Sequence, residues 1–583
     1  MGKNRSGGAA SELLRAAAAA AGRISRRTFV TGAGLSGLLS AASSRALSAP
    51  ADIASADGTP EQIHLTWGED PASSVCISWA SAAQAVNPRV QLRQSTSNVH
   101  AQQASSVHAQ QASSVHAVQR TYTDGLNGQT VFTYHASLTG LKDNAEYHYA
   151  VTADNDRHRA RPFGATFRTA PKGRVPFRWT SYGDLATPNT AWTLSSPQSA
   201  FAVKAVERFQ PLFHLLNGDL CYANLNPAAQ PAVWADFGNN VQVSASRRPW
   251  MPCPGNHEIE FGNGAQGFNS YLTRYTLPQN GTPFSGLWYR FQVGSVLFIS
   301  LSADDVIYQD SGAFVAGPSP LQPAPSTGNP PIAPGTTLYV RGYSEGAQTR
   351  WLESTLAAAS QDVSIDWIVV QMHQDALSSS KNGNGSDKGI RETWLPLFDR
   401  YGVDLVLCGH DHDYERSWPV RGCNHDAGRD AASGAPVDTL QPKPVATSNP
   451  ADDAFDTTLG TVHFILGGGG TNAPLDAYGV NPDSGAPQAK VITKHNRPLP
   501  AKTPGTFAKP GADALEDAIW SARRDTGTGY GIGVFDLDPG TPGGKTSISI
   551  SYYHALGADM AATANYELFE TVVLAKTRRD TAK

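Results

Sequence analysis

The sequence is poor in the features that mark several protein classes. Its 583 residues include only five cysteines, too few for a disulfide-stabilised scaffold. No apolar run reaches the roughly 18 residues of a membrane-spanning helix. A formal charge of −4 at pH 7 argues against a bulk nucleic-acid binder. We therefore expect neither a transmembrane span nor a nucleic-acid partner.

Glycine and proline, in contrast, are abundant. The chain contains 55 glycines and 39 prolines, which favours strands, turns and long loops over a helical bundle. Hydrophobic residues make up 40% of the chain and charged residues 16%, so the chain can bury a core. At roughly 150 residues per domain, this length predicts two to four domains.

The first 56 residues have the pattern of an export signal. Arg26 and Arg27 directly precede a weakly apolar stretch, residues 29–42, and small residues follow it. A basic region, a short apolar region and a small-residue zone are typical of a signal peptide, and the paired arginines indicate the twin-arginine type. We expect residues 1–56 to be signal peptide and spacer, the twin-arginine export machinery to be a partner, and the mature protein to be periplasmic or extracellular. A cytosolic amphipathic tail is the alternative.

Removal of the signal would make the protein more acidic. Residues 1–48 hold seven Lys or Arg residues and one acid, Glu12. The remainder has 39 basic and 49 acidic residues. The mature chain is thus expected to carry a clear negative charge.

Residues 57–172 have an all-β pattern. Apolar and polar residues alternate in Ile63–Trp67 and Val75–Trp79, with turn residues between them. Leu138–Leu141 followed by Tyr147–Val151 resembles the tyrosine corner of fibronectin-type sandwiches. We expect a fibronectin-III-like β-sandwich here.

Residues 173–583 have the alternation of an α/β domain. Short β-branched or aromatic runs end in polar, glycine-containing loops, and helical patterns lie between several of them. The Pro/Gly/Asp-rich stretches 309–345 and 418–458 are expected to be surface loops. The expected strands are 177–180, 212–216, 296–299, 367–370, 403–407, 462–466, 530–537 and 546–553, and the expected helices are 200–209, 346–359 and 390–401.

Polar side chains able to bind metals follow four of these runs, 177–180, 212–216, 367–370 and 403–407, and also lie in the loop Pro254–Glu258. In an α/β sheet, groups at the carboxyl ends of strands converge on one crevice. Asp184 and Asp219 are 35 residues apart, Asp219 and Asn256 are 37 apart, and so are His373 and His410. A strand–helix–strand crossover takes about 30 or more residues, so each step returns the chain to the same edge.

The residue types favour two metal ions. Asp, Asn and Tyr oxygens are hard ligands, and histidine nitrogens suit Zn, Fe, Mn or Ni. His410 and His412 lie two residues apart, so on an extended segment they point to one side and could serve two adjacent ions. Tyr222 is the unusual member, because a phenol with a pKa near 10 ionises at neutral pH only beside a strong positive charge. It indicates a trivalent ion such as Fe(III).

Two cysteines lie beside these motifs. Cys221 lies inside the second motif and Cys253 just before the third. If both loops meet at the metals, a Cys221–Cys253 disulfide can form in an exported protein, although the sequence leaves the pairing open.

The ordered set of motifs resembles that of the purple acid phosphatases of the metallophosphoesterase superfamily. Residues 60–65 also resemble the start of that family's fibronectin-like domain. The motifs are Gly183-Asp184, Gly218-Asp219-Leu220-Cys221-Tyr222, Gly255-Asn256-His257-Glu258, His373, and Gly409-His410-Asp411-His412-Asp413-Tyr414-Glu415-Arg416.

The resemblance implies a fold and a ligand set. The fold would be a four-layer α/β/β/α sandwich of the calcineurin-like phosphoesterase type. Asp184, Tyr222 and His412 would hold Fe(III), whereas Asn256, His373 and His410 would hold a divalent Fe, Zn or Mn ion. Asp219 would bridge the two ions.

The implied activity is that of an acid phosphatase. The metal pair would supply a hydroxide that attacks a small phosphate monoester, and His257 would steady the transition state or protonate the leaving group. Plant members carry further histidines about nine residues beyond the His373 equivalent, but Ser380–Gly385 contains none, which leaves other leaving-group acids unassigned. Two alternatives remain: a phosphodiesterase on the same metals, and an envelope-associated binding protein with an inert phosphoesterase domain.

Overall fold

The computed structural model of the 583-residue chain describes most of the sequence after residue 57. The expected signal segment 1–56 lies outside the described residues. The described residues are 58–95, 113–154, 162–260, 262–264, 266–309, 341–380, 383–445, 454–471, 478–494, 497–498, 507–508, 513–555 and 566–580.

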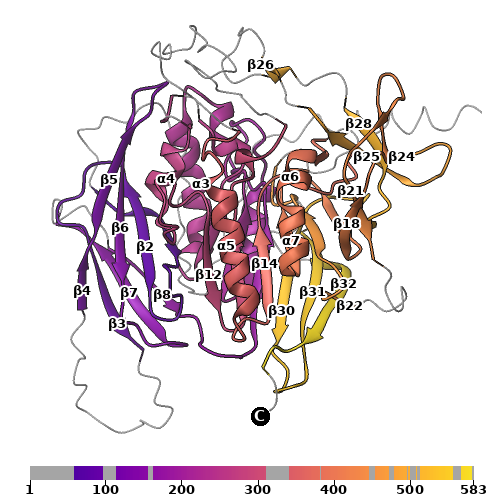
Figure 1. Ribbon diagram of the computed structural model, residues 1–583. Helices are drawn as coiled ribbons and strands as arrows, with labels where there is room; N and C mark the ends of the chain where they lie inside the picture. Colours follow the sequence, from indigo (N-terminus) through magenta and orange to yellow (C-terminus); the bar gives the residue numbers. More distant parts are fainter. Residues whose placement is uncertain are drawn as a thin grey trace, which may run out of the picture. The chain divides into compact units, whose positions relative to one another are not determined.

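Eight strands near the N-terminus form two four-stranded antiparallel sheets, drawn in indigo and violet in Figure 1. Their inward positions are apolar, with Trp79 stacked on Tyr134 at 5.6 Å and Tyr147 on Phe167 at 5.5 Å. The expected all-β N-terminal domain is therefore confirmed as a fold class. The first sheet has the order β1(Glu61–Thr66)-β2(Val75–Ser81)-β6(Thr130–Leu138)-β5(Val118–Thr123), and the second β4(Ser113–His116)-β3(Arg89–Gln94)-β7(Glu146–Thr152)-β8(Phe163–Arg168).

The rest of the described chain contains two mixed seven-stranded sheets. Trp179 of the first sheet meets Phe298 of the second edge to face at 5.3 Å, so the sheets share one aromatic core. The first has the order β11(Trp250–Cys253)-β10(Phe213–Asn217)-β9(Phe177–Tyr182)-β30(Gly531–Asp538)-β31(Lys545–Ala555)-β32(Tyr566–Thr577)-β22(Ala454–Asp456). The second has the order β12(Tyr289–Val293)-β13(Val296–Ser300)-β14(Trp367–Gln371)-β16(Leu405–Cys408)-β23(Val462–Leu466)-β17(Tyr414–Ser417)-β29(Ser521–Arg524).

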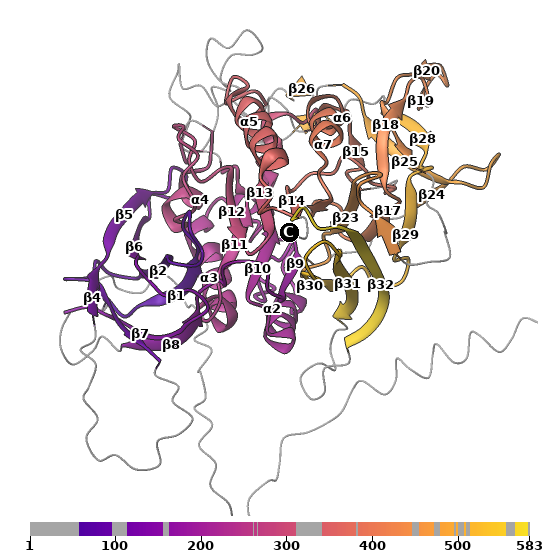
Figure 2. The same ribbon diagram turned by 60° about the horizontal axis from the view of Figure 1, so that its bottom comes forward.

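Helices cover the outer faces of both sheets. Helix α2(Gln198–Phe209) packs on β30 and β31 of the first sheet, and α3(Gln230–Ala245) packs on α2 and on β1 of the sandwich. Helices α5(Ala347–Gln361), α6(Lys388–Thr393) and α7(Leu395–Tyr401) lie beside the second sheet (Figure 2). This arrangement is the expected four-layer α/β/β/α sandwich. The helix expected over 390–401 is instead two helices, because Pro396 lies in the first turn of α7 and cannot donate the hydrogen bond that a continuous helix needs.

The stretch expected to be a surface loop at 418–458 is largely structured. It contains β18(Val420–Asn424), β19(Gly428–Asp430), β20(Pro436–Val437), β21(Gln441–Pro444) and β22. Strands β19 and β20 extend a peripheral sheet with β15(Ser386–Asp387), β25(Pro487–Ile492) and β28(Ala514–Asp517). The loop expectation was wrong because the turn residues separate very short strands. Some of them pair locally, β18 with β21 and β19 with β20, and others pair with strands distant in sequence, β19 with β28 and β22 with β32.

Two further expectations concern a disulfide bond and membrane-spanning helices. Cys221 and Cys253 are both buried free thiols, so the disulfide that the sequence left open is not formed. Among the described helices, none has the length and apolar character needed to cross a bilayer.

Candidate metal centre

The candidate ligands follow the carboxyl ends of five strands in the two sheets. Strands β9, β10 and β11 of the first sheet run parallel to one another, as do β14 and β16 of the second. Their following loops carry all seven predicted ligands and His257. This is where the strand-end argument places them.

Four of these residues adopt left-handed backbone conformations. Asp184 has φ 60°, Asp219 50°, Tyr222 58° and His410 70°. Such conformations cost roughly 1–2 kcal/mol for a residue with a side chain, and they gather at functional sites where surrounding contacts enforce them. The sharp turns direct each side chain toward the same point.

Asp184, Tyr222 and His412 form one half of the site. The Tyr222 hydroxyl lies 2.9 Å from Asp184 Oδ1 and 3.1 Å from His412 Nε2, and His412 Nε2 lies 3.2 Å from Asp184 Oδ1. Asp184 and Tyr222 are fully buried. Three donor atoms from three loops thus meet at one point.

Asp219, His373 and His410 form the other half. Their ligand atoms all lie within 4.8 Å of one another, and among the described residues no other group of His, Cys, Asp or Glu meets this criterion. His373 Nε2 is 3.0 Å from Asp219 Oδ2 and 3.2 Å from His410 Nδ1. This geometry fits one shared cation.

Asn256 and His257 adjoin this half. The His257 backbone N–H donates to Asp219 Oδ1 at 2.9 Å, which brings the 256–258 turn against the carboxylate. Asn256 Oδ1 is buried and has no hydrogen-bond partner, as expected of an oxygen that serves a cation. His257 Nε2 lies 3.9 Å from Asp219 Oδ2, and its side chain is 21% exposed.

The second ring nitrogen of each histidine has a partner that fixes the ring. His373 Nδ1 lies 2.6 Å from the Asn217 carbonyl, so it donates there and leaves Nε2 free to bind. A metal-ligating histidine is commonly oriented in this way. The corresponding contacts are His410 Nε2 to Gln309 Oε1 at 3.3 Å, His412 Nδ1 to Thr471 Oγ1 at 3.1 Å, and His257 Nδ1 to Asn224 Oδ1 at 2.9 Å.

Glu258 joins two of the loops. Its carboxylate accepts the backbone N–H of Asp219 at 2.9 Å, Leu220 at 2.8 Å and Gly255 at 2.7 Å. It is fully buried. The last residue of the Gly-Asn-His-Glu motif therefore holds the Asp219 loop against the Asn256 loop.

Glycines in the motifs make room for the ligands. A Cβ atom on Gly255 would lie 2.3 Å from Asp219 Oδ1, and one on Gly409 would lie 2.5 Å from Asp184 Oδ2. A Cβ atom on Gly218 would meet His373 Nδ1 at 2.5 Å. Each distance is far shorter than van der Waals contact, so any side chain there would displace a ligand.

The electrostatics of the site match a cation-binding role. Burial raises the pKa of Tyr222 well above its usual value, and the nearby Asp184 and Asp219 raise it further. Burial lowers the pKa of His373, but Asp219 and Asp184 outweigh this effect and raise it to about 10. In the protein alone, bound protons offset the negative charge of the buried carboxylates. Metal cations would offset the same charge and would leave the histidine nitrogens available as ligands. The donor set therefore fits two metal ions.

Sequence reasoning missed the residues that orient the ligands. Asn217, Asn224, Gln309 and Thr471 carry no motif signal that separates them from ordinary loop residues, whereas Glu258 stood inside a motif and could have been singled out. His425, outside the motifs, is 66% exposed and contacts Asp438 at 3.1 Å.

Strand-end ligands on two facing mixed sheets are the arrangement of a metallophosphoesterase. Residues 195–414 match the family model described as calcineurin-like phosphoesterase, and residues 60–170 match the purple acid phosphatase N-terminal domain. The chain belongs to the purple acid phosphatase family, which uses a dinuclear metal centre.

Individual relatives agree with this assignment. An uncharacterized protein of Mycobacterium tuberculosis is 41% identical over 508 residues, covering 85% of this chain and 84% of that one. The Fe(3+)-Zn(2+) purple acid phosphatase 12 of Arabidopsis thaliana is 24% identical over 370 residues, covering 62% and 65%. The structure of purple acid phosphatase PPD1 from yellow lupin aligns with a TM-score of 0.58 at 17% identity, over 90% of this chain and 75% of that one, which supports the fold.

Proposed function

We propose that the protein is an acid phosphatase that hydrolyses phosphate monoesters at a dinuclear Fe(III)–M(II) centre. Family membership supports phosphoesterase hydrolysis. The observation that carries the iron assignment is the contact of the Tyr222 hydroxyl with Asp184 and His412, because a buried phenol among carboxylates needs a strongly charged cation to ionise.

Each residue has a role in this proposal. Asp184, Tyr222 and His412 would hold the ferric ion, Asn256, His373 and His410 would hold a divalent Fe, Zn or Mn ion, and Asp219 would be shared by both. A pair of such cations lowers the pKa of water and offsets the charge of a phosphate group. The name of the Arabidopsis relative, which specifies Fe(3+) and Zn(2+), supports this pairing.

His257 is the proposed acid. Asn224 Oδ1 can only accept a hydrogen bond, so His257 Nδ1 donates to it and Nε2 points toward Asp219. When the imidazole is protonated, Nε2 can pass a proton to a leaving alcohol. Its partly exposed side chain leaves room for a substrate beside it.

The test is phosphate release by the purified protein together with metal analysis. A nitrophenyl monoester should be hydrolysed faster than the bis-nitrophenyl diester, with iron and one divalent metal bound. Faster hydrolysis of the diester would favour a phosphodiesterase. If Asp219→Ala released phosphate as fast as the wild type, the measured activity would not come from this site, and the inert binding domain would be favoured. His148→Ala, on strand β7 of the sandwich, is a suitable control.

We also propose export by the twin-arginine route. The paired Arg26 and Arg27 before the apolar stretch support it. In a host with this export system, replacing both arginines by lysine should retain the precursor in the cytoplasm, as measured by cell fractionation. Unchanged export of the lysine variant would refute the route.

A further inference from the structure

The loop that leaves the Asn256-His257-Glu258 turn is closed around Asn263. This loop, described at residues 259–260, 262–264 and 266–268, leads into α4(Asn269–Arg274). The Glu260 N–H donates to the Gly267 carbonyl at 2.9 Å, and Asn263 donates from its backbone to the Glu260 carbonyl and from Nδ2 to Glu260 Oε2, at 3.1 and 2.7 Å. Asn263 is 2% exposed. A movement of Asn263 would therefore displace Glu260, which lies three residues from His257.

Asn263 is also held by the tip of the β5–β6 hairpin of the N-terminal sandwich. Its Nδ2 donates to Asp124 Oδ2 at 3.0 Å, and its Oδ1 accepts the Gly125 N–H at 2.9 Å. The other Asp124 oxygen accepts the N–H groups of Leu126 and Asn127, each at 3.0 Å. The carboxylate is thus fixed by its own turn and presents one oxygen to the catalytic loop.

The two backbones touch at a pair of glycines. A Cβ atom on Gly125 would lie 2.3 Å from the Gly262 carbonyl oxygen. Gly262 itself has φ +84°, which favours glycine. A side chain on Gly125 therefore has no room unless the loop moves, whereas a side chain on Gly262 would mainly strain the backbone.

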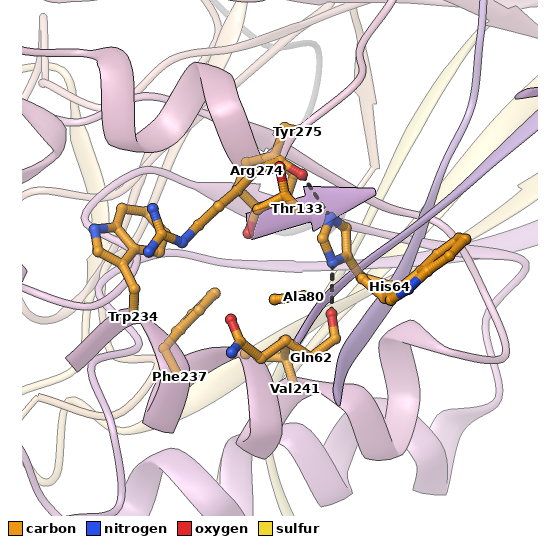
Figure 3. Close-up of a pocket in the computed structure, with 11 residues that line it drawn as sticks. Gln62, His64, Ala80, Thr133, Trp234, Phe237, Val241, Arg274 and Tyr275 are labelled. Carbon is orange, nitrogen blue, oxygen red and sulfur yellow. Dashed lines mark hydrogen bonds between the residues drawn. The ribbon is translucent and has the colours of Figure 1, made fainter. Parts of the chain in front are cut away.

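The sandwich sheet that contains β5 and β6 also holds the end of α4 and the residues that follow it. Arg274 Nη1 donates to Tyr122 Oη at 2.9 Å, and His64 Nε2 lies 3.1 Å from the Arg274 carbonyl (Figure 3). Thr133 Oγ1 donates to the Thr273 carbonyl at 2.9 Å. Figure 3 shows Arg274 beside Trp234, whose ring it covers at 4.7 Å. Side chains of strands β1, β5 and β6 thus form hydrogen bonds with the end of α4.

From these contacts we propose that Asp124 and Gly125 of the N-terminal sandwich are positioning residues for the reaction, because they hold, through Asn263 and Glu260, the loop that directly follows the turn with Asn256 and His257. The proposal rests on the proposed role of His257. Under this proposal the N-terminal domain contributes to catalysis and does not serve only as a separate domain for docking.

Three parts of the protein hold this loop. Glu258 ties its start to the Asp219 loop, Trp234 of α3 donates to the Glu260 carboxylate, and the hairpin tip ties the far side of the loop to the sandwich. Loss of the hairpin attachment leaves Asn256 beside Glu258 but allows His257 to shift. A displacement of about 1 Å in a catalytic group can cost up to about 10²-fold in rate. The metals should remain bound, so substrate binding should change little.

The first test compares Gly125→Ala with Gly164→Ala. Gly164 lies in the same domain, and a Cβ atom there would be 3.5 Å from the Tyr149 carbonyl oxygen, an ordinary contact. Gly125→Ala should lower kcat at least tenfold, leave KM within about twofold and leave metal content unchanged. Gly164→Ala should match the wild type. Equal kcat in the two variants would overturn the proposal, and so would a loss confined to KM.

The second test is a double-mutant cycle that does not depend on the Gly125 clash. If Asp124 acts through Asn263, Asp124→Ala combined with Asn263→Ala should lose no more kcat than the more damaging single variant. Losses that multiply would refute the proposed path. Asp154→Ala, which removes a surface pair with Arg89 in the same domain, serves as the control.

Hydrogen exchange separates this proposal from the proposed function. Amides in the 256–264 peptides should exchange faster in Asp124→Ala than in Asp154→Ala, as measured by mass spectrometry. Unchanged exchange would refute the attachment even in an active enzyme. A wild-type protein without phosphatase activity but with this exchange difference would refute the proposed function and leave the attachment supported.

Discussion

Tyr222 is the residue that distinguishes this metal centre from one built only of carboxylates, amides and imidazoles. Its buried hydroxyl contacts Asp184 at 2.9 Å, and its φ of 58° shows that the backbone is bent to place it there. A tyrosine beside a carboxylate gains nothing from ionising, because burial and Asp184 both raise its pKa. Its position is best explained by a cation.

We expect the iron-loaded protein to absorb visible light through this phenolate. Tyr222→Phe should remove the visible band. Tyr182→Phe should preserve it, since Tyr182 is also fully buried, precedes Asp184 by two residues and has a hydroxyl without a hydrogen-bond partner. The measurement is the absorption spectrum at matched iron content. A band that survives in Tyr222→Phe would exclude tyrosine ligation of iron.

At the scale of elements, Asp387 ties the start of α6 to the segment that orients His410. Its carboxylate accepts the N–H of Gly389 at 2.7 Å, and those of Tyr308 and Gln309 at 2.9 and 2.8 Å. Gln309 in turn contacts His410 Nε2. The carboxylate that caps α6 therefore also helps to position His410 of the candidate metal centre.

We expect Asp387→Ala to lower the free energy of unfolding by about 1–3 kcal/mol, because it removes a cap and leaves buried N–H groups without a partner. Urea unfolding at neutral pH measures the change. Asp483→Ala, in an exposed turn, should change it by less than about 0.5 kcal/mol. Equal stability of the two variants would contradict the structural role of Asp387.

The loop that contacts the sandwich should make stability depend on pH. Burial raises the pKa of Glu260 from 4.5 to about 7. Between these values the folded protein holds a proton that the unfolded chain has lost, so the contribution of Glu260 to stability falls as pH rises. From pH 5 to 7.5, the unfolding free energy of the wild type should fall relative to that of Glu260→Gln. Parallel pH profiles would show that Glu260 is ionised throughout.

For the whole molecule, metal removal should lower the melting temperature. The centre joins loops from both seven-stranded sheets, so cations that bind only the folded state stabilise all of it. A chelator at pH 7 should lower Tm by several degrees, and adding iron with zinc should restore it. Calorimetry with metal analysis provides the check. An unchanged Tm after proven metal loss would show that the site is rigid without ions.

Much of the fold followed from local patterns. The expected runs 367–370 and 403–407 correspond to β14 and β16, because buried parallel strands are nearly continuous apolar stretches, and the alternating run 177–180 corresponds to β9. The twin-arginine segment and the domain limits 57–172 and 173–583 stay predictions. The errors lie where local signals compete: turn residues concealed the short strands β18–β21, and Pro396 divided a helix.

The side chains that meet at the candidate site were predictable from the sequence, and their surroundings were not. Metal-binding side chains at strand ends are recognisable because strand, turn and ligand are adjacent in the chain. The partners Asn224, Gln309 and Thr471, and the Asp124–Asn263 contact across 139 positions, depend on how loops and domains pack, and no local periodicity reports that. Sequence thus suffices to name the side chains that converge at the candidate centre, whereas the orientation of each group arises from long-range hydrogen bonds that exist only once the chain has folded.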